Sequence, residues 1–100
     1  MSHPIILRAE AESEFRQAFQ WYEDRFPGLG TSFVVAVDAC LQAIGRNPQA
    51  YQKKHKNIRG GPVRRFPFVI YYLFDRETVV VLAVFHASRD PQIWHERTET

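Results

Sequence analysis

The sequence has almost no cysteine and no long hydrophobic run. Its single cysteine, Cys40, excludes a disulfide within the chain and any metal site made only of cysteine ligands. The longest apolar runs, Phe68–Phe74 and Val79–Phe85, have seven residues each, whereas a helix needs about 20 apolar residues to cross a membrane. The start of the chain, Met1–Pro4, lacks the charged and apolar regions of a secretion signal. We therefore expect a soluble, cytoplasmic protein that does not associate with membranes.

Acidic residues are missing from the middle of the chain. Residues 1–38 carry six acidic and three basic residues, residues 39–74 carry seven basic and no acidic ones, and residues 75–100 carry five acidic and three basic. This distribution favours a middle segment that contacts phosphates or an acidic protein, although a basic loop that only keeps the chain soluble would look the same. The candidate residues for binding a nucleic acid or a protein target are Lys53, Lys54, Lys56, Arg59, Arg64 and Arg65.

Apolar residues are plentiful enough for one hydrophobic core. The 100 residues are 45% hydrophobic and 14% aromatic, which argues against an intrinsically disordered chain and is too little for two separate cores. We expect a single domain over residues 1–100.

The spacing of apolar residues predicts two helices joined as a hairpin. Within Glu10–Phe26, apolar residues recur every three or four positions, as they do on one face of a helix. A second helix is expected over Leu29–Ile44, because Pro27-Gly28 interrupts the first pattern. The connection is short, so the two helices should be antiparallel.

Strand patterns flank the two helices. The expected strands are Pro4–Arg8, Val63–Phe66, Phe68–Phe74 and Val79–His86, and a short helix is expected at Asp90–Arg97. The polar and basic segment Gln49–Pro62 is expected to be a loop of the kind that is usually functional or mobile. The predicted fold is an α+β domain in the order β-α-α-β-β-β, with the helix hairpin packed on one face of a mostly antiparallel four-stranded sheet.

The last two strands are apolar on both faces. This pattern predicts that both faces of the sheet must be shielded from water. The expected core residues are Ile70, Tyr72, Leu82 and Val84 from the sheet and Phe15, Ala18, Phe33 and Val37 from the helices. One helix hairpin covers one face of a sheet. The other face must be closed by the C-terminal segment, by a second copy of the chain or by a partner.

Short motifs follow one another along nearly the whole chain. They are Trp21-Tyr22-Glu23 at the end of the first helix, Pro27–Phe33 at the start of the second, Arg59 and Val63–Tyr72 in the basic region, Val79–Val84 in the last strand, and His86–Pro91 with Trp94 after it. In this order they resemble the RelE/ParE superfamily of toxins from type II toxin–antitoxin, or plasmid stabilisation, systems. The resemblance implies a toxin that inhibits growth and is neutralised by a cognate antitoxin protein.

The resemblance leaves the target open, because the superfamily contains two kinds of toxin. ParE-like toxins inhibit DNA gyrase, whereas RelE-like toxins cut messenger RNA on the ribosome, which needs an acid, a base and a cation beside the phosphate. RelE-like toxins place one arginine where this sequence has Phe68 and another where it has Arg89. The missing arginine favours gyrase inhibition. The alternatives are a ribosome-dependent endoribonuclease that uses Arg65, His86 and Arg89, and a non-toxic member of the superfamily.

Several of these residues also have structural interpretations. His86, at a strand end, would hydrogen-bond the following turn at Ser88 or Arg89, and Arg89 would pair with Asp90. Cys40 would be a small buried side chain, and Trp21 and Trp94 would be either core residues or exposed contacts for a partner. His3, His55, His86 and His95 lack the usual spacing of metal ligands, so we expect no metal and no cofactor. A homodimer of the isolated chain is the alternative to a complex with the antitoxin.

Overall fold

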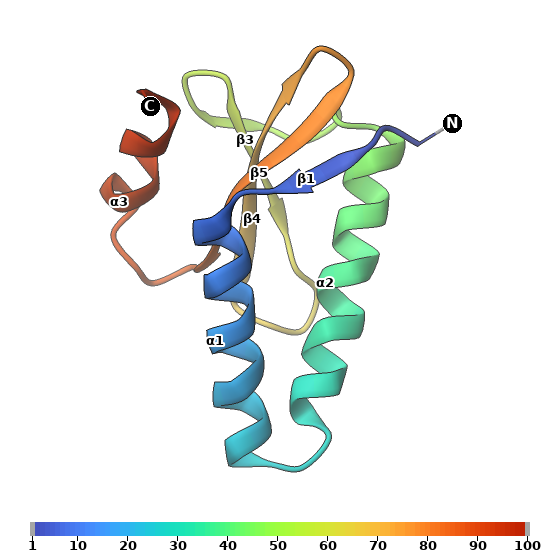
Figure 1. Cartoon of the computed structure of the whole chain (residues 1–100), viewed down its shortest axis with the longest axis vertical. Helices are drawn as coiled ribbons and strands as arrows, with labels where there is room; N and C mark the ends of the chain where they lie inside the picture. The colour runs from blue at the N-terminus through green and yellow to red at the C-terminus, as the bar shows by residue number, and fades with distance from the viewer. Residues whose placement is uncertain (1, 100) are drawn as a thin grey trace.

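Two helices form a hairpin that lies against one face of a five-stranded sheet (Figure 1). The computed structural model describes residues 2–99. The helices are α1 (Ala9–Arg25), α2 (Leu29–Arg46), α3 (Gln92–His95) and the 3-10 helix η1 (Glu96–Glu99). The strands are β1 (Ile5–Leu7), β2 (Lys53–His55), β3 (Ile58–Pro62), β4 (Phe68–Asp75) and β5 (Thr78–His86). The predicted α+β class and the position of the helix hairpin are confirmed.

Local chemistry sets the boundaries of the helices. Glu10 and Glu12 lie in the first turn of α1, where their negative charges interact favourably with the positive end of the helix dipole. The helix ends before Phe26, whose backbone is extended (φ −156°, ψ 123°). Gly28 then takes a φ of +90°, a left-handed conformation that glycine adopts at little cost. Both long helices lie within two residues of their predicted bounds.

Helix α2 is the most apolar of the helices, and by length and composition alone it could cross a membrane. In the fold its apolar face is used differently, because Phe33, Val37 and Ile44 are buried in the core formed with α1 and the sheet. A buried stripe of this kind is typical of a helix that packs in a protein core. Within the described part of the chain, no other helix meets the same length and composition criteria.

The sheet has the strand order β1-β5-β4-β3-β2. β1 runs parallel to β5, and all other neighbouring strands are antiparallel. β5 and β4 therefore lie inside the sheet, as their apolar sequences predict, and residues 81–85 of β5 are all buried. The prediction of four strands is wrong, because the sheet contains five.

The additional strand comes from the segment that is expected to be a loop. β2 and β3 form a hairpin inside Gln49–Pro62, whereas the predicted strand Val63–Phe66 is a turn in which Arg65 has a φ of 73°. The prediction fails because Gly60-Gly61 has the composition of a turn but lies in β3. A Cβ atom on Gly61 would stand 2.9 Å from Cδ1 of Ile44. The glycine therefore allows β3 to approach α2 closely.

A β-bulge in β5 moves one predicted core residue to the other side of the sheet. Tyr71 pairs with Ala83 but Tyr72 pairs with Val81, so Leu82 is the extra residue of the bulge. Leu82 is buried as predicted, but it lies beside Ala83 in the cluster on the face away from α1 and α2. The other predicted core residues do lie on the helix side: Phe15, Ala18, Phe33, Val37, Ile70, Tyr72 and Val84.

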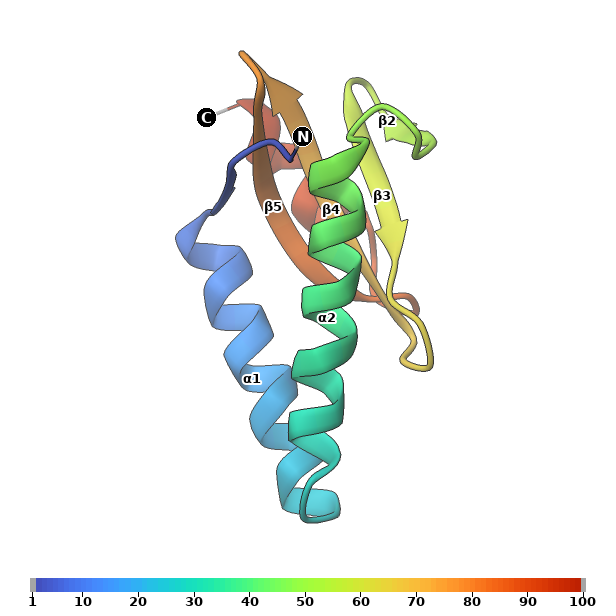
Figure 2. The same cartoon turned by 90° about the vertical axis from the view of Figure 1, so that its right-hand side faces the viewer.

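The C-terminal segment closes the second face of the sheet, on the side away from the helix hairpin (Figure 2). Trp94 of α3 is only 2% exposed, and its indole stacks on the ring of Tyr71 with 3.9 Å between the ring centroids. The same cluster contains Ile58, Leu82, Ala83 and Phe85. Of the three alternatives for closing this face (the C-terminal segment, a second copy of the chain or a partner), the structure uses the C-terminal segment.

Two charged side chains continue the hydrogen bonding of β5 beyond the end of β1. β1 pairs with β5 only as far as Val81. Beyond that point Oε1 of Glu14 accepts the N–H of Val84 (3.1 Å), and Nη1 of Arg97 donates to the carbonyl of Leu82 (2.8 Å). Arg97 and Glu14 also form a bidentate ion pair with N–O distances of 3.1 and 2.8 Å. The two side chains are 15% and 13% exposed, so each nearly buried charge is paired.

Replacing Gly61 with alanine is expected to destabilise the domain by about 1–3 kcal/mol, because the new methyl group would collide with the fully buried Ile44. Urea unfolding of the purified variant measures this loss. The double variant Gly61→Ala/Ile44→Val lacks the colliding Cδ1 atom and should recover part of it, whereas Ile44→Val alone should cost about 0.5–1.5 kcal/mol. Equal stability of Gly61→Ala and the wild type would contradict the close approach of β3 to α2.

Candidate functional site

An apolar groove of about 420 Å³ lies between α1 and the end of the sheet where β4 begins and β5 ends. Its apolar walls are Ala18, Trp21, Tyr22, Pro67, Phe68 and Val84, and its polar rim is Glu14, Gln17, His86 and Arg89. Trp21 is 51% exposed, so a ligand in the groove would gain contact with a large aromatic side chain.

Packed aromatic rings hold the wall of the groove in place. The ring of Tyr22 lies 5.2 Å from that of Phe33, 4.9 Å from that of Phe66 and 6.1 Å from that of Phe68. Phe33 is fully buried, so this wall rests on the core. Burial raises the pKa of Tyr22, so its hydroxyl stays protonated at neutral pH and is a poor general base.

His86 holds the turn that follows β5. Its Nδ1 accepts the N–H of Ser88 at 3.1 Å and lies 2.7 Å from the hydroxyl of Ser88, and its ring packs against Phe68 with 5.3 Å between the centroids. Because Nδ1 accepts a backbone hydrogen bond, the proton of the neutral ring is assigned to Nε2. The structural interpretation of His86 as a hydrogen-bond partner of the following turn is confirmed.

Arg89 lines the groove, but its predicted pairing with Asp90 is wrong. The guanidinium carbon lies 4.2 Å from the centroid of the Phe85 ring, which is a cation–π contact. Asp90 instead accepts the N–H of Gln92 through Oδ1 at 2.9 Å, which leaves the carboxylate at the start of α3. Arg65, the third candidate for a nuclease site, is exposed in the turn between β3 and β4 and does not line the groove.

The basic residues expected to bind a target do not form one surface. Lys53, Lys54 and Lys56 lie on or next to β2 at one end of the sheet, whereas Arg64 and Arg65 lie in the β3–β4 turn at the other end (Figure 2). All five side chains are exposed. The positive charge of the middle segment is therefore split between two places. The β2–β3 hairpin carries Lys53, Lys54 and Lys56, and we call it the lysine-rich hairpin. The β3–β4 turn carries Arg64 and Arg65.

Arg59, the sixth basic candidate, holds the backbone between α2 and β2. Its Nη1 donates to the carbonyl oxygens of Gln49 (3.2 Å) and Tyr51 (2.6 Å). Burial raises the pKa of the neighbouring Tyr72 to about 12, although the positive charge of Arg59 lowers it. The hydroxyl of Tyr72 donates to the carbonyl of Pro48 at 2.6 Å. The guanidinium of Arg59 is thus engaged in structure, whereas the side chains of the lysine-rich hairpin are exposed.

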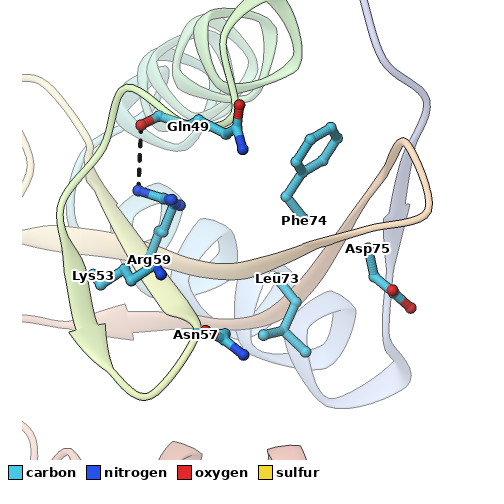
Figure 3. Close-up of a pocket in the computed structure, with 7 residues that line it drawn as sticks. All are labelled: Gln49, Lys53, Asn57, Arg59, Leu73, Phe74 and Asp75. Atoms are coloured by element: carbon cyan, nitrogen blue, oxygen red, sulfur yellow. Dashed lines mark hydrogen bonds between the residues drawn. The ribbon is translucent and has the colours of Figure 1, made fainter.

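A polar hollow of about 350 Å³ lies beside Arg59 (Figure 3). It is lined by Gln49, Lys53, Asn57, Arg59, Leu73, Phe74 and Asp75. Its two cations are accompanied by the carboxylate of Asp75, so it carries less positive charge than the lysine-rich hairpin next to it.

The lysine-rich hairpin also holds the C-terminal segment. The ring of His55 in β2 stacks parallel to the ring of His95 in α3, with 3.8 Å between the centroids and an angle of 2°. Burial lowers the pKa of His95, and His55 lowers it further while Asp90 raises it. The stacked arrangement therefore favours a neutral His95.

Cys40 has a structural role in the core. Burial raises the pKa of Cys40 to about 11, and its Sγ lies 3.6 Å from the carbonyl oxygens of Gly61 and Pro62. The prediction that Cys40 is a small buried side chain is confirmed. Among the side chains that the structure describes, no three His, Cys, Asp or Glu residues come together as metal ligands.

Two residues next to the groove carry no recognisable pattern in the sequence. Glu14 and Arg97 are 83 positions apart, and their roles in satisfying the backbone of β5 appear only once the sheet is assembled. The sequence does not decide whether each tryptophan is a core residue or an exposed contact. In the structure Trp94 is buried in the core, and Trp21 is exposed beside the groove.

The fold is shared with chains in two solved toxin–antitoxin structures. One, from the chromosomal ParDE system of P. aeruginosa, covers 85% of this chain and 96% of its own with a TM-score of 0.75 and 11% sequence identity. The other, from the RelBE2 toxin–antitoxin complex of Mycobacterium tuberculosis, covers 86% and 99% with a TM-score of 0.59 and 17% identity. At these identities the likeness establishes the fold alone.

Sequence comparison identifies the family within this class. The family model described as "ParE toxin of type II toxin-antitoxin system, parDE" matches residues 5–91, and the chain belongs to this ParE toxin family. It is 26% identical over 92 residues to Toxin ParE2 of Mycobacterium tuberculosis strains CDC 1551 / Oshkosh and H37Rv, which covers 91% of this chain and 88% of the relative. The resemblance noted from the sequence motifs is confirmed.

Arg59→Gln is expected to destabilise the domain by about 1.5–3 kcal/mol, because two backbone carbonyls lose a charged donor. Lys54→Gln is the matched control. Its Nζ is exposed and contacts only Gln52 within the described residues, so it should change stability by less than about 0.5 kcal/mol. Urea unfolding measures both. Equal effects of the two substitutions would show that Arg59 is not structural.

Acidification is expected to loosen the C-terminal segment. Because the pKa of His95 is lower in the folded protein than its ordinary value of about 6.5, protonation disfavours the folded state. The contribution of His95 is therefore complete above about pH 6.5 and is lost as the pH falls below it. In a Trp21→Phe background Trp94 is the sole tryptophan, and its fluorescence should shift to the red as the pH falls below about 6.5. His95→Asn should abolish this pH dependence, and an unchanged red shift in that variant would exclude His95 as the cause.

Proposed function

We propose that this ParE-family toxin inhibits DNA gyrase by binding it and is neutralised by a cognate antitoxin. The observation that carries the proposal is the composition of the groove, which has six apolar wall residues and, in Arg89, only one cationic side chain. A site that cleaves RNA must balance the charge of the phosphorane with several donors or cations. An apolar groove with a polar rim instead suits the side chains of a protein, so the composition of the groove argues against a nuclease without placing the target in the groove itself.

The endoribonuclease alternative has one observation in its favour, because His86 and Arg89 line the same groove. Three observations weigh against it. Arg65 does not line the groove, Phe68 stands where a RelE-like toxin has an arginine, and Nδ1 of His86 is already engaged with Ser88. Together they support a protein-binding toxin over an enzyme that transfers protons at a phosphate.

The antitoxin is inferred from the solved neighbours, whose names describe toxin–antitoxin assemblies. The groove and the lysine-rich hairpin are both accessible, and a segment with apolar and acidic side chains would complement them. The second face of the sheet is already closed by Trp94, so a partner would have to displace α3 to reach it. We place the toxin and its antitoxin in the cytoplasm, where gyrase acts, and a homodimer of the free toxin stays a prediction.

The purified protein is expected to inhibit DNA supercoiling by gyrase and to leave ribosome-bound messenger RNA intact. Arg89→Lys keeps the positive charge at the groove and should inhibit gyrase within about threefold of the wild type, because no bond-breaking step depends on the guanidinium. In a nuclease, loss of one such transition-state donor would typically reduce the cleavage rate about a hundredfold.

Two results would overturn this proposal. Ribosome-dependent cleavage by the wild type, abolished by Arg89→Lys with an unchanged circular dichroism spectrum, would identify an endoribonuclease. Normal growth after induction, together with full gyrase activity, would identify a non-toxic member of the family.

A further inference from the structure

The connection between α1 and α2 projects beyond the end of the sheet. Residues 25–30, which we call the hairpin tip, lie at the far end of the molecule from the β2–β3 turn in both views (Figures 1 and 2). Phe26 in this tip is 67% exposed. No core contact explains an aromatic side chain at this position.

The backbone of the hairpin tip is held rigidly. The carboxylate of Glu23 accepts the N–H of Gly28 (3.0 Å) and of Gly30 (2.9 Å), and the N–H of Leu29 donates to the carbonyl of Phe26 (3.0 Å). A Cβ atom on Gly30 would lie 2.8 Å from Oε1 of Glu23, so the glycine is needed for this close approach. A preorganised loop presents Phe26 without the entropy cost of ordering the backbone on binding.

An arginine and a second aromatic ring accompany Phe26. The guanidinium of Arg25 lies 3.7 Å from the centroid of the Trp21 ring, which is 51% exposed. Among residues 2–99 this guanidinium donates to no acceptor, so its N–H groups remain available for a carboxylate of a partner. Trp21 itself lines the groove, so within the hairpin tip the exposed residues are Phe26 and Arg25. An exposed phenylalanine and an arginine on a rigid element have the composition of an interface.

The charges around the hairpin tip indicate the chemistry of the partner. Glu23 is occupied by the backbone, and Asp24 accepts a hydrogen bond from Gln20 at 2.7 Å. Arg25 is therefore the one nearby charged side chain without a polar partner in the described part of the chain, whereas the exposed lysines lie at the opposite end of the molecule. A nucleic acid would be attracted to the lysine end. The tip fits an apolar cleft in a protein, bordered by an acidic side chain.

We propose that the hairpin tip is the element that binds the target of the toxin. Phe26 enters an apolar cleft on the target protein, and Arg25 pairs with a carboxylate at the rim of that cleft. This inference rests on the proposed function and extends it, because it assigns the target to the tip and the antitoxin to the groove and the lysine-rich hairpin.

The test compares Phe26→Ser and Arg25→Glu with Val35→Ser, a matched control that is 64% exposed on α2 of the same hairpin. Phe26→Ser and Arg25→Glu should each weaken inhibition of gyrase supercoiling about tenfold or more. Val35→Ser should stay within about twofold of the wild type. All three variants should melt within a few degrees of the wild type and should still co-purify with the cognate antitoxin.

Each alternative outcome has a defined meaning. Wild-type inhibition of gyrase by Phe26→Ser, or an equal loss in Val35→Ser, would overturn the role of the tip and leave the proposed function standing. If the wild type does not inhibit gyrase, the proposed function fails and growth arrest becomes the readout. Phe26→Ser that binds the antitoxin but no longer arrests growth would then support the tip, and full arrest would overturn it. A wild-type dimer that Phe26→Ser dissociates would assign the tip to a second copy and contradict the proposal.

Discussion

The fold depends on covering both faces of strand β5 with a chain of only 100 residues. Residues 81–85 are buried in succession, so neither face of this strand can be left to water. The helix hairpin covers one face, and no second helix pair exists in the described chain for the other. The C-terminal segment fills this role with one tryptophan, and the ion pair between Glu14 and Arg97 fastens it. The groove is open because α1 reaches past the sheet at the point where β4 begins and β5 ends.

Much of this architecture can be predicted from the sequence, because helices and strong strands leave periodic patterns. The failures have a common physical cause. Gly60-Gly61 has the composition of a turn, but its lack of side chains is used for the close contact between β3 and α2. The bulge at Leu82 shifts the alternation of β5 by one residue, and such a shift depends on the partner strand. Both features are set by contacts between segments far apart in the chain, which local patterns do not contain.

The site is harder to predict than the fold, since charge and residue type do not reveal what a side chain contacts. Arg59 and Lys54 belong to the same basic segment, yet only Arg59 is committed to backbone carbonyls. His86 has the residue type of a catalyst, but its Nδ1 holds a turn. The sequence allows the same two interpretations for Trp21 and Trp94, yet Trp21 is exposed and Trp94 is buried. The groove itself combines α1 with the ends of β4 and β5, so its walls come together only in the folded chain.

The meeting of the two chain ends has a consequence for biosynthesis. β1, at residues 5–7, can pair in the sheet only after residues 79–81 have been synthesised. In the same way, Glu14 in α1 can form its ion pair only after Arg97 has been synthesised. Contacts of such long sequence separation form late, because closing a long loop costs entropy before the contact is made. At a synthesis rate of about 5–20 residues per second, the segment of the first helix is therefore complete for several seconds before the strands that bury it are made. Until then its apolar face lacks the sheet that covers it in the folded protein.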